Sequence, residues 1–130
     1  MVQDLDRIRL SQQTKDQLSR LKRITGMEQW NMICRWGFCI SIADSNNPPN
    51  SKIPTDSNIE MEWETFSGEH SSVYWGLLLQ RAKQEGIEPT KQNLLNLLRR
   101  HITRGIAHLT ARREITNVGV LFKSTALSGV

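Results

Sequence analysis

The chain has 130 residues, of which 38% are hydrophobic and 23% are charged, and its formal net charge at pH 7 is +4. This length supports one hydrophobic core and excludes two large independent domains. No apolar run reaches the length of a membrane span and the N-terminus has no secretory pattern, so we expect a cytoplasmic protein.

The first predicted element is a short strand over residues 6–10. Its apolar and charged residues alternate, which predicts that Ile8 and Leu10 face inward while Arg7 and Arg9 face outward.

A helix is predicted next, over residues 11–25. Ser11 is placed to cap its N-terminus, Gly26 follows its last turn, and four residues at helical spacing form one inward stripe: Thr14, Leu18, Leu21 and Thr25.

A second helix is predicted over residues 28–43, and it is apolar around nearly its whole circumference. A chain of this size cannot easily bury such a helix by itself, so we expect part of the surface to contact another subunit. The predicted oligomer interface consists of Trp30, Met32, Ile33, Trp36 and Ile40.

The order of strand, helix, turn and helix is that of ribbon-helix-helix DNA-binding proteins. In that architecture the strands of two chains pair into a ribbon that enters the major groove. Arg7 and Arg9 would then contact base edges.

Residues 44–58 contain three of the four prolines and are predicted to form a loop. The following segment, residues 59–64, alternates apolar residues with Glu60, Glu62 and Glu64, which predicts a half-buried strand. No histidine or aspartate accompanies these glutamates, so we interpret them as a solvated face.

Two further helices are predicted. One runs from Ser71 or Ser72 to Glu85, with Val73, Leu77, Leu78 and Trp75 inward, and Gly86 ends it. The other begins near Thr90, with an inward stripe of Leu94, Leu98, Ile102, Ile106 and Leu109.

On this last helix we expect Arg100 and Arg104 opposite the stripe, flanked by partly exposed His101 and His108. The overall prediction is a mainly helical fold: a ribbon-helix-helix-like unit extended by two helices. It forms a single compact domain over residues 1–113, and residues 114–130 form a weakly patterned tail.

The sequence has no phosphate-binding glycine loop, HExxH, CxxC or GxSxG motif. We therefore expect no catalytic residue, metal site or cofactor. Cys34 and Cys39 lie in the apolar second helix, and these surroundings should raise the pKa of the Cys34 thiol, which favours buried packing over a role as nucleophile or sulfur carrier.

Charge is distributed unevenly, with local balances of +3 over residues 1–43, −5 over residues 44–89 and +6 over residues 90–130. Two basic faces beside an acidic one indicate a polyanion-binding protein. The predicted DNA-binding residues are Arg7, Arg9, Lys15, Arg20, Lys22, Arg23, Arg100 and Arg104.

The chain resembles the DndE family of bacterial DNA phosphorothioation proteins across almost its whole length. The resemblance is carried by RIRLSQQTKDQLSRLKRITGMEQWNMICRWGFCISIAD, the proline-bearing loop, IEMEWETF and LLRRHITRGIAHL. It implies a small cytoplasmic DNA-binding oligomer, a tetramer, in a system that replaces a backbone phosphate oxygen with sulfur. It also implies partner proteins: a cysteine desulfurase, a sulfurtransferase component and an ATPase.

Residues and resemblance together predict a non-catalytic component that holds the DNA backbone and prefers a nicked duplex. Two alternatives stay open. One is a ribbon-helix-helix transcriptional regulator or antitoxin, although Glu28 near the start of the second helix would repel a phosphate there. The other is a DNA-nicking enzyme, which would need clustered carboxylates or a positioned nucleophile.

Overall fold

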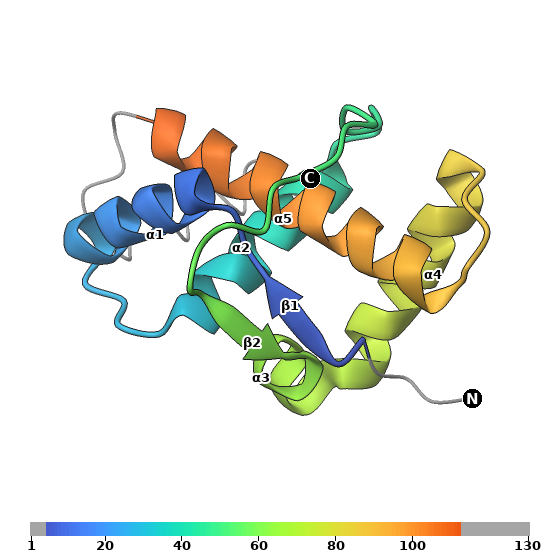
Figure 1. Cartoon of the computed structure of the whole chain (residues 1–130), viewed down its shortest axis with the longest axis horizontal. Helices are drawn as coiled ribbons and strands as arrows, with labels where there is room; N and C mark the ends of the chain where they lie inside the picture. Colours follow the sequence, from blue (N-terminus) through green and yellow to red (C-terminus); the bar gives the residue numbers. More distant parts are fainter. Residues whose placement is uncertain (1–4, 113–130) are drawn as a thin grey trace.

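The computed structural model describes residues 5–112. Within them lie four helices of at least 14 residues, one short helix and a two-stranded sheet (Figure 1). In chain order the elements are β1 (Arg7–Arg9), α1 (Gln12–Thr25), α2 (Trp30–Ala43), β2 (Glu60–Glu62), α3 (Trp63–Ser67), a 3-10 turn (Gly68–His70), α4 (Ser71–Glu85) and α5 (Lys91–Ala111). The predicted mainly helical fold is confirmed. The predicted tail, residues 114–130, lies outside the described residues.

Helix α1 forms where its local signals place it. The Ser11 side chain accepts a hydrogen bond from the Thr14 backbone N–H at 3.1 Å, which satisfies one donor of the first turn. Gly26 ends the helix in the left-handed conformation with φ of 75°. All four residues of the predicted inward stripe are buried.

The small sheet pairs β1 with β2 in antiparallel register, with Ile8 opposite Met61 and Arg9 opposite Glu60. The regulator-type prediction instead pairs β1 with the same strand of a second chain. The structure makes this pairing within one chain, because β2 offers a buried Met61 to the core and a carboxylate to the arginines. Figure 1 shows the two strands side by side.

Helices α2 and α5 cross in close contact at two glycines. A Cβ atom built on Gly105 would lie 1.7 Å from the carbonyl oxygen of Gly37. A Cβ atom built on Gly37 would lie 2.9 Å from Ile106 Cδ1. The absence of side chains at this crossing lets the two backbones approach closely and makes these helices the centre of the core.

Helices α4 and α5 begin and end close to their predicted limits. Gly86 ends α4 with φ of 72°, and the Thr90 side chain caps α5 through the Asn93 backbone N–H. All five residues of the predicted α5 stripe are buried. Val73 was predicted to face inward, but it is 56% exposed because α4 turns Trp75 and Leu78 to the core.

Segment 44–58, between α2 and β2, contains no helix or strand, as predicted. It passes across α5 (Figure 1), where Asn50 accepts a hydrogen bond from Arg100. Among residues 5–112, no helix is long and apolar enough to cross a membrane.

Candidate nucleic-acid interface

Two strand arginines flank one glutamate on the outer face of the sheet. Arg7 Nη1 lies 3.1 Å from Glu60 Oε1, and Arg9 Nη2 pairs with Glu60 Oε2. The hydrogen bond from Arg9 lowers the pKa of Glu60 below its usual value, and Arg7 acts in the same direction. The side chains of Arg7 and Arg9 remain 72% and 47% exposed at a solvent-facing surface, where both pair with Glu60. Exposed Glu62, opposite Arg7 in the register, lies on the same face of the sheet.

This positive surface continues onto α1. Lys15 Nζ donates to Asn58 Oδ1 at 2.5 Å, and a hollow of about 360 Å³ is lined by Lys15, Trp30 and Glu60 among others. Lys22 Nζ lies 4.1 Å from the centre of the Trp30 ring, within the range of a cation–π contact. We call Arg7, Arg9, Lys15 and Lys22 the basic strip.

The two remaining α1 cations, Arg20 and Arg23, are exposed. Neither forms an ion pair with the described residues. They are available to an anion, and Arg23 directly follows Lys22 of the basic strip in the chain.

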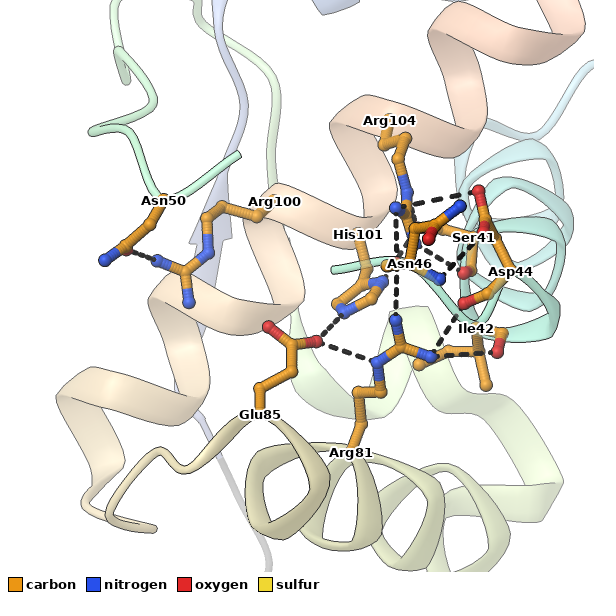
Figure 2. A network of polar contacts seen from close by, with 10 residues as sticks. All are labelled: Ser41, Ile42, Asp44, Asn46, Asn50, Arg81, Glu85, Arg100, His101 and Arg104. Carbon is orange, nitrogen blue, oxygen red and sulfur yellow. Dashed lines mark hydrogen bonds and ion pairs between the residues drawn. The ribbon is translucent and has the colours of Figure 1, made fainter. Parts of the chain in front are cut away.

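Arg104 of α5 holds the end of α2. Its Nε donates to Ser41 Oγ, its Nη1 to the Asn46 carbonyl and its Nη2 to the Ser41 carbonyl, each at 2.7 Å. Arg104 was predicted to belong to an open basic face; in the structure its guanidinium is hydrogen-bonded to Ser41 in the last turn of α2 and to Asn46 in the loop that follows. Figure 2 shows it in this network, whereas Arg100 points away toward Asn50.

Arg81 of α4 completes this network and was not singled out by the sequence analysis. It is only 3% exposed. Its Nη1 donates to the carbonyls of Ile42 and Asp44, its Nη2 to that of Asn46, and its Nε to Glu85 Oε2 at 2.8 Å. The four-residue spacing of Arg81 and Glu85 on a helix was the available signal for this pair.

His101 was predicted to be partly exposed, but it is completely buried. Its Nδ1 lies 2.7 Å from Ser41 Oγ and its Nε2 lies 2.8 Å from Glu85 Oε2 (Figure 2). Burial lowers the pKa of His101 to about 4, because the desolvated imidazolium is disfavoured more than Glu85 stabilises it.

The row of serine, histidine and carboxylate has the members of a catalytic triad. However, Ser41 is 2% exposed and its Oγ accepts a hydrogen bond from Arg104, so the hydroxyl is already engaged and nearly inaccessible to a substrate. The arrangement instead satisfies buried polar groups at the junction of α2, α4 and α5.

Comparison with known proteins decides the family. The family model for "DNA sulphur modification protein DndE" matches residues 7–117. The chain belongs to the DndE family.

Solved structures agree with this assignment. The crystal structure of DndE from Escherichia coli B7A, involved in DNA phosphorothioation modification, is similar with a TM-score of 0.70 and 25% identity over 80% of this chain and 95% of that one. A DndE G21/24K mutant involved in DNA phosphorothioation gives a TM-score of 0.65 and 26% identity over 82% and 98% of the two chains. No curated protein sequence matches this chain.

The five residues of the predicted oligomer interface do not lie on one surface of this DndE-family chain. Ile33 and Ile40 pack into the chain's own core, with 0% and 8% exposure, because they lie on the side of α2 that faces inward. The ring of Trp30 lies beneath Lys22, which belongs to the basic strip. Met32 and Trp36 line a hollow of about 190 Å³ on the outer side of α2, together with Arg35, Cys39 and Tyr74.

Burial disfavours the thiolate form of both cysteines. Cys34 is completely buried, and desolvation raises its pKa to about 12. Desolvation also raises the pKa of Cys39. The described residues contain no group of three or more His, Cys, Asp or Glu side chains placed to hold a metal ion.

Proposed function

We propose that this DndE-family chain holds the backbone of double-stranded DNA within the phosphorothioation system without itself cutting the strand. The observation that carries this proposal is the basic strip, in which four cations from β1 and α1 lie on one surface. Two of them, Arg7 and Arg9, pair with Glu60. Contacts of this kind neutralise phosphates regardless of base sequence. Arg20 and Arg23, which are exposed on α1, are further candidate phosphate contacts.

The preferred DNA is a nicked duplex. Bending an intact duplex around several basic faces costs on the order of 1 to 6 kcal/mol, whereas a nick acts as a flexible joint. Nicked duplex should therefore bind more tightly than an intact duplex of the same sequence and ionic strength. Equal affinities would contradict this preference and leave general duplex binding.

The protein acts as a homo-oligomer, a tetramer, whose contacts include Met32 and Trp36. The supporting feature is the hollow on the outer side of α2, where Met32 remains 38% exposed beside Trp36 and Arg35. Its other partners are a cysteine desulfurase, a sulfurtransferase component and an ATPase. Exposed carboxylates of the acidic segment 44–89, Glu64 and Glu69 among them, are candidate contacts for these proteins.

The deciding experiment measures DNA affinity by fluorescence anisotropy across a salt series. Replacing Lys15, Lys22 and Arg23 together by Glu should abolish binding, because phosphate contacts are lost and repulsion is added. Lys83→Glu, an exposed α4 residue outside the basic strip, is the control that should bind nearly normally. Unchanged affinity of the triple variant at low salt would refute the assignment.

The same samples test the two alternatives. Metal-dependent nicking by clean protein would establish an enzyme, and strong preference for one operator-like sequence would establish a regulator. Sequence-independent binding without cleavage supports the backbone-holding function.

A further inference from the structure

A second cationic site lies between segment 50–55 and the first half of α5. It is a hollow of about 480 Å³ whose lining includes Lys52, Arg99 and Arg100. None of its lining residues is an aspartate or glutamate. Three cations therefore share one concave space without a carboxylate in its wall.

The two arginines are held in place by neutral acceptors. Arg100 Nη1 donates to Asn50 Oδ1 at 2.5 Å, and Arg99 Nη1 donates to Asn96 Oδ1 at 3.2 Å. Arg99 Nε donates to the carbonyl of Arg9 at 3.1 Å. These bonds orient both guanidinium groups but leave their charges uncompensated.

Both arginines are partly withdrawn from water. Arg100 Nε is buried and has no hydrogen-bond partner among the described residues. Desolvation lowers the pKa of Arg99, which means that the surroundings disfavour its charged form. An anion in the hollow would offset this cost, because it would stabilise the charged form of the cations that line it.

The shape of the site favours a terminal phosphate over an internal one. An internal backbone phosphate carries one negative charge and is bonded to a sugar on each side. These two sugars hinder its entry into a concave site. A phosphomonoester can carry two negative charges and is attached on one side only, which lets it enter a concave site. The volume lies within the range of small-molecule sites, and Ile53 and Pro54 supply apolar wall beside the polar groups.

We propose that this hollow binds a phosphomonoester, and that its source is the terminal phosphate of a DNA strand. The link to DNA is Arg9, which belongs to the basic strip and is hydrogen-bonded to Arg99 of the hollow. A strand that follows the basic strip and ends there would place its terminal phosphate beside Lys52, Arg99 and Arg100. The DNA source rests on the proposed function, whereas the phosphomonoester site itself does not.

The test compares nicked duplexes that carry a phosphate or a hydroxyl at the nick, on the 5′ side and separately on the 3′ side. We expect removal of the phosphate from one of these ends to weaken binding about tenfold, the size of one added charge-assisted contact. For the double variant Lys52→Gln/Arg100→Gln, the duplex with a phosphate at the nick and the duplex with a hydroxyl there should have affinities within about twofold of each other. Lys22→Gln is the matched control: it should weaken both duplexes while keeping their ratio.

A second arm titrates the protein with inorganic phosphate and with a nucleoside 5′-monophosphate, followed by NMR. Saturable shifts at Lys52, Arg99 and Arg100 that vanish in the double variant, without end discrimination on DNA, would assign the site to a free nucleotide and overturn the DNA source. No end discrimination and no saturable shifts would overturn the site altogether. If DNA does not bind at all, the proposed function fails while this arm still decides the site.

Discussion

The close approach of α2 and α5 makes Gly105→Ala a severe test of the fold. The added Cβ would lie 1.7 Å from the Gly37 carbonyl oxygen, 2.2 Å from its carbon and 2.6 Å from its Cα. All three are backbone atoms of a buried helix, so no side-chain rotation relieves the overlap. The helices would have to separate by more than about 1 Å, which loosens the packing along the whole contact.

Overpacking of a well-packed core costs about 1 to 3 kcal/mol, and a clash with backbone belongs at or above the top of that range. We therefore expect Gly105→Ala to lower the free energy of unfolding by about 3 kcal/mol or more, out of a total of about 5 to 15 kcal/mol. For a domain of this size the melting temperature should fall by about 10 °C or more. Urea unfolding followed by circular dichroism measures the first quantity, and calorimetry measures the second.

Gly76→Ala is the matched control. Gly76 lies within α4, is exposed, and has no atom within 4 Å of a built Cβ. Alanine is the better helix former, so this variant should be more stable by about 1 kcal/mol. A Gly105→Ala protein that unfolds within about 0.5 kcal/mol of the wild type would refute the close helix crossing.

Three other outcomes can be checked. The unfolded chain protonates His101 near pH 6.5 and the native state near pH 4, so stability should fall by up to about 3 kcal/mol as pH drops through this window. In His101→Gln the free energy of unfolding should vary less with pH over that range than in the exposed-site control His70→Gln, and equal slopes would contradict the burial. Trp36→Asp should give smaller species in sedimentation velocity, because a charge would be buried against an apolar partner; a wild-type monomer at micromolar concentration would rule out the interface. Lys22→Gln should reduce the slope of log K against log salt for duplex DNA by about 0.9, and Lys83→Gln should leave it unchanged.

The elements of this protein were predictable wherever their signals are local. Ser11, Gly26, Gly86 and Thr90 mark helix ends through hydrogen bonds to groups within one helical turn and through a backbone conformation that glycine adopts readily. The inward stripes of α1 and α5 follow from periodicity alone. Sequence reasoning therefore reached the helical fold, the loop over residues 44–58 and the cations of the basic strip.

The surroundings of individual side chains were decided by tertiary contacts. Ser41 and His101 are 60 positions apart, and Arg9 and Arg99 are 90 apart, so no sequence window contains both partners. The same periodicity that places His101 beside a basic face cannot show that α2 and α4 cover it. Likewise, Lys52 lies in the loop over residues 44–58 and Arg100 lies in α5, so no sequence periodicity relates the two residues.

The sequence by itself determined where the helices begin and end and which of their faces are apolar, because those properties depend on neighbours one turn away. Only the tertiary structure decided that β1 pairs with β2, that Arg104 holds the end of α2, and that three cations surround one hollow. The Arg104 contact depends on how α5 crosses α2 at Gly105 and Gly37, and all three depend on packing between segments that are distant in the sequence.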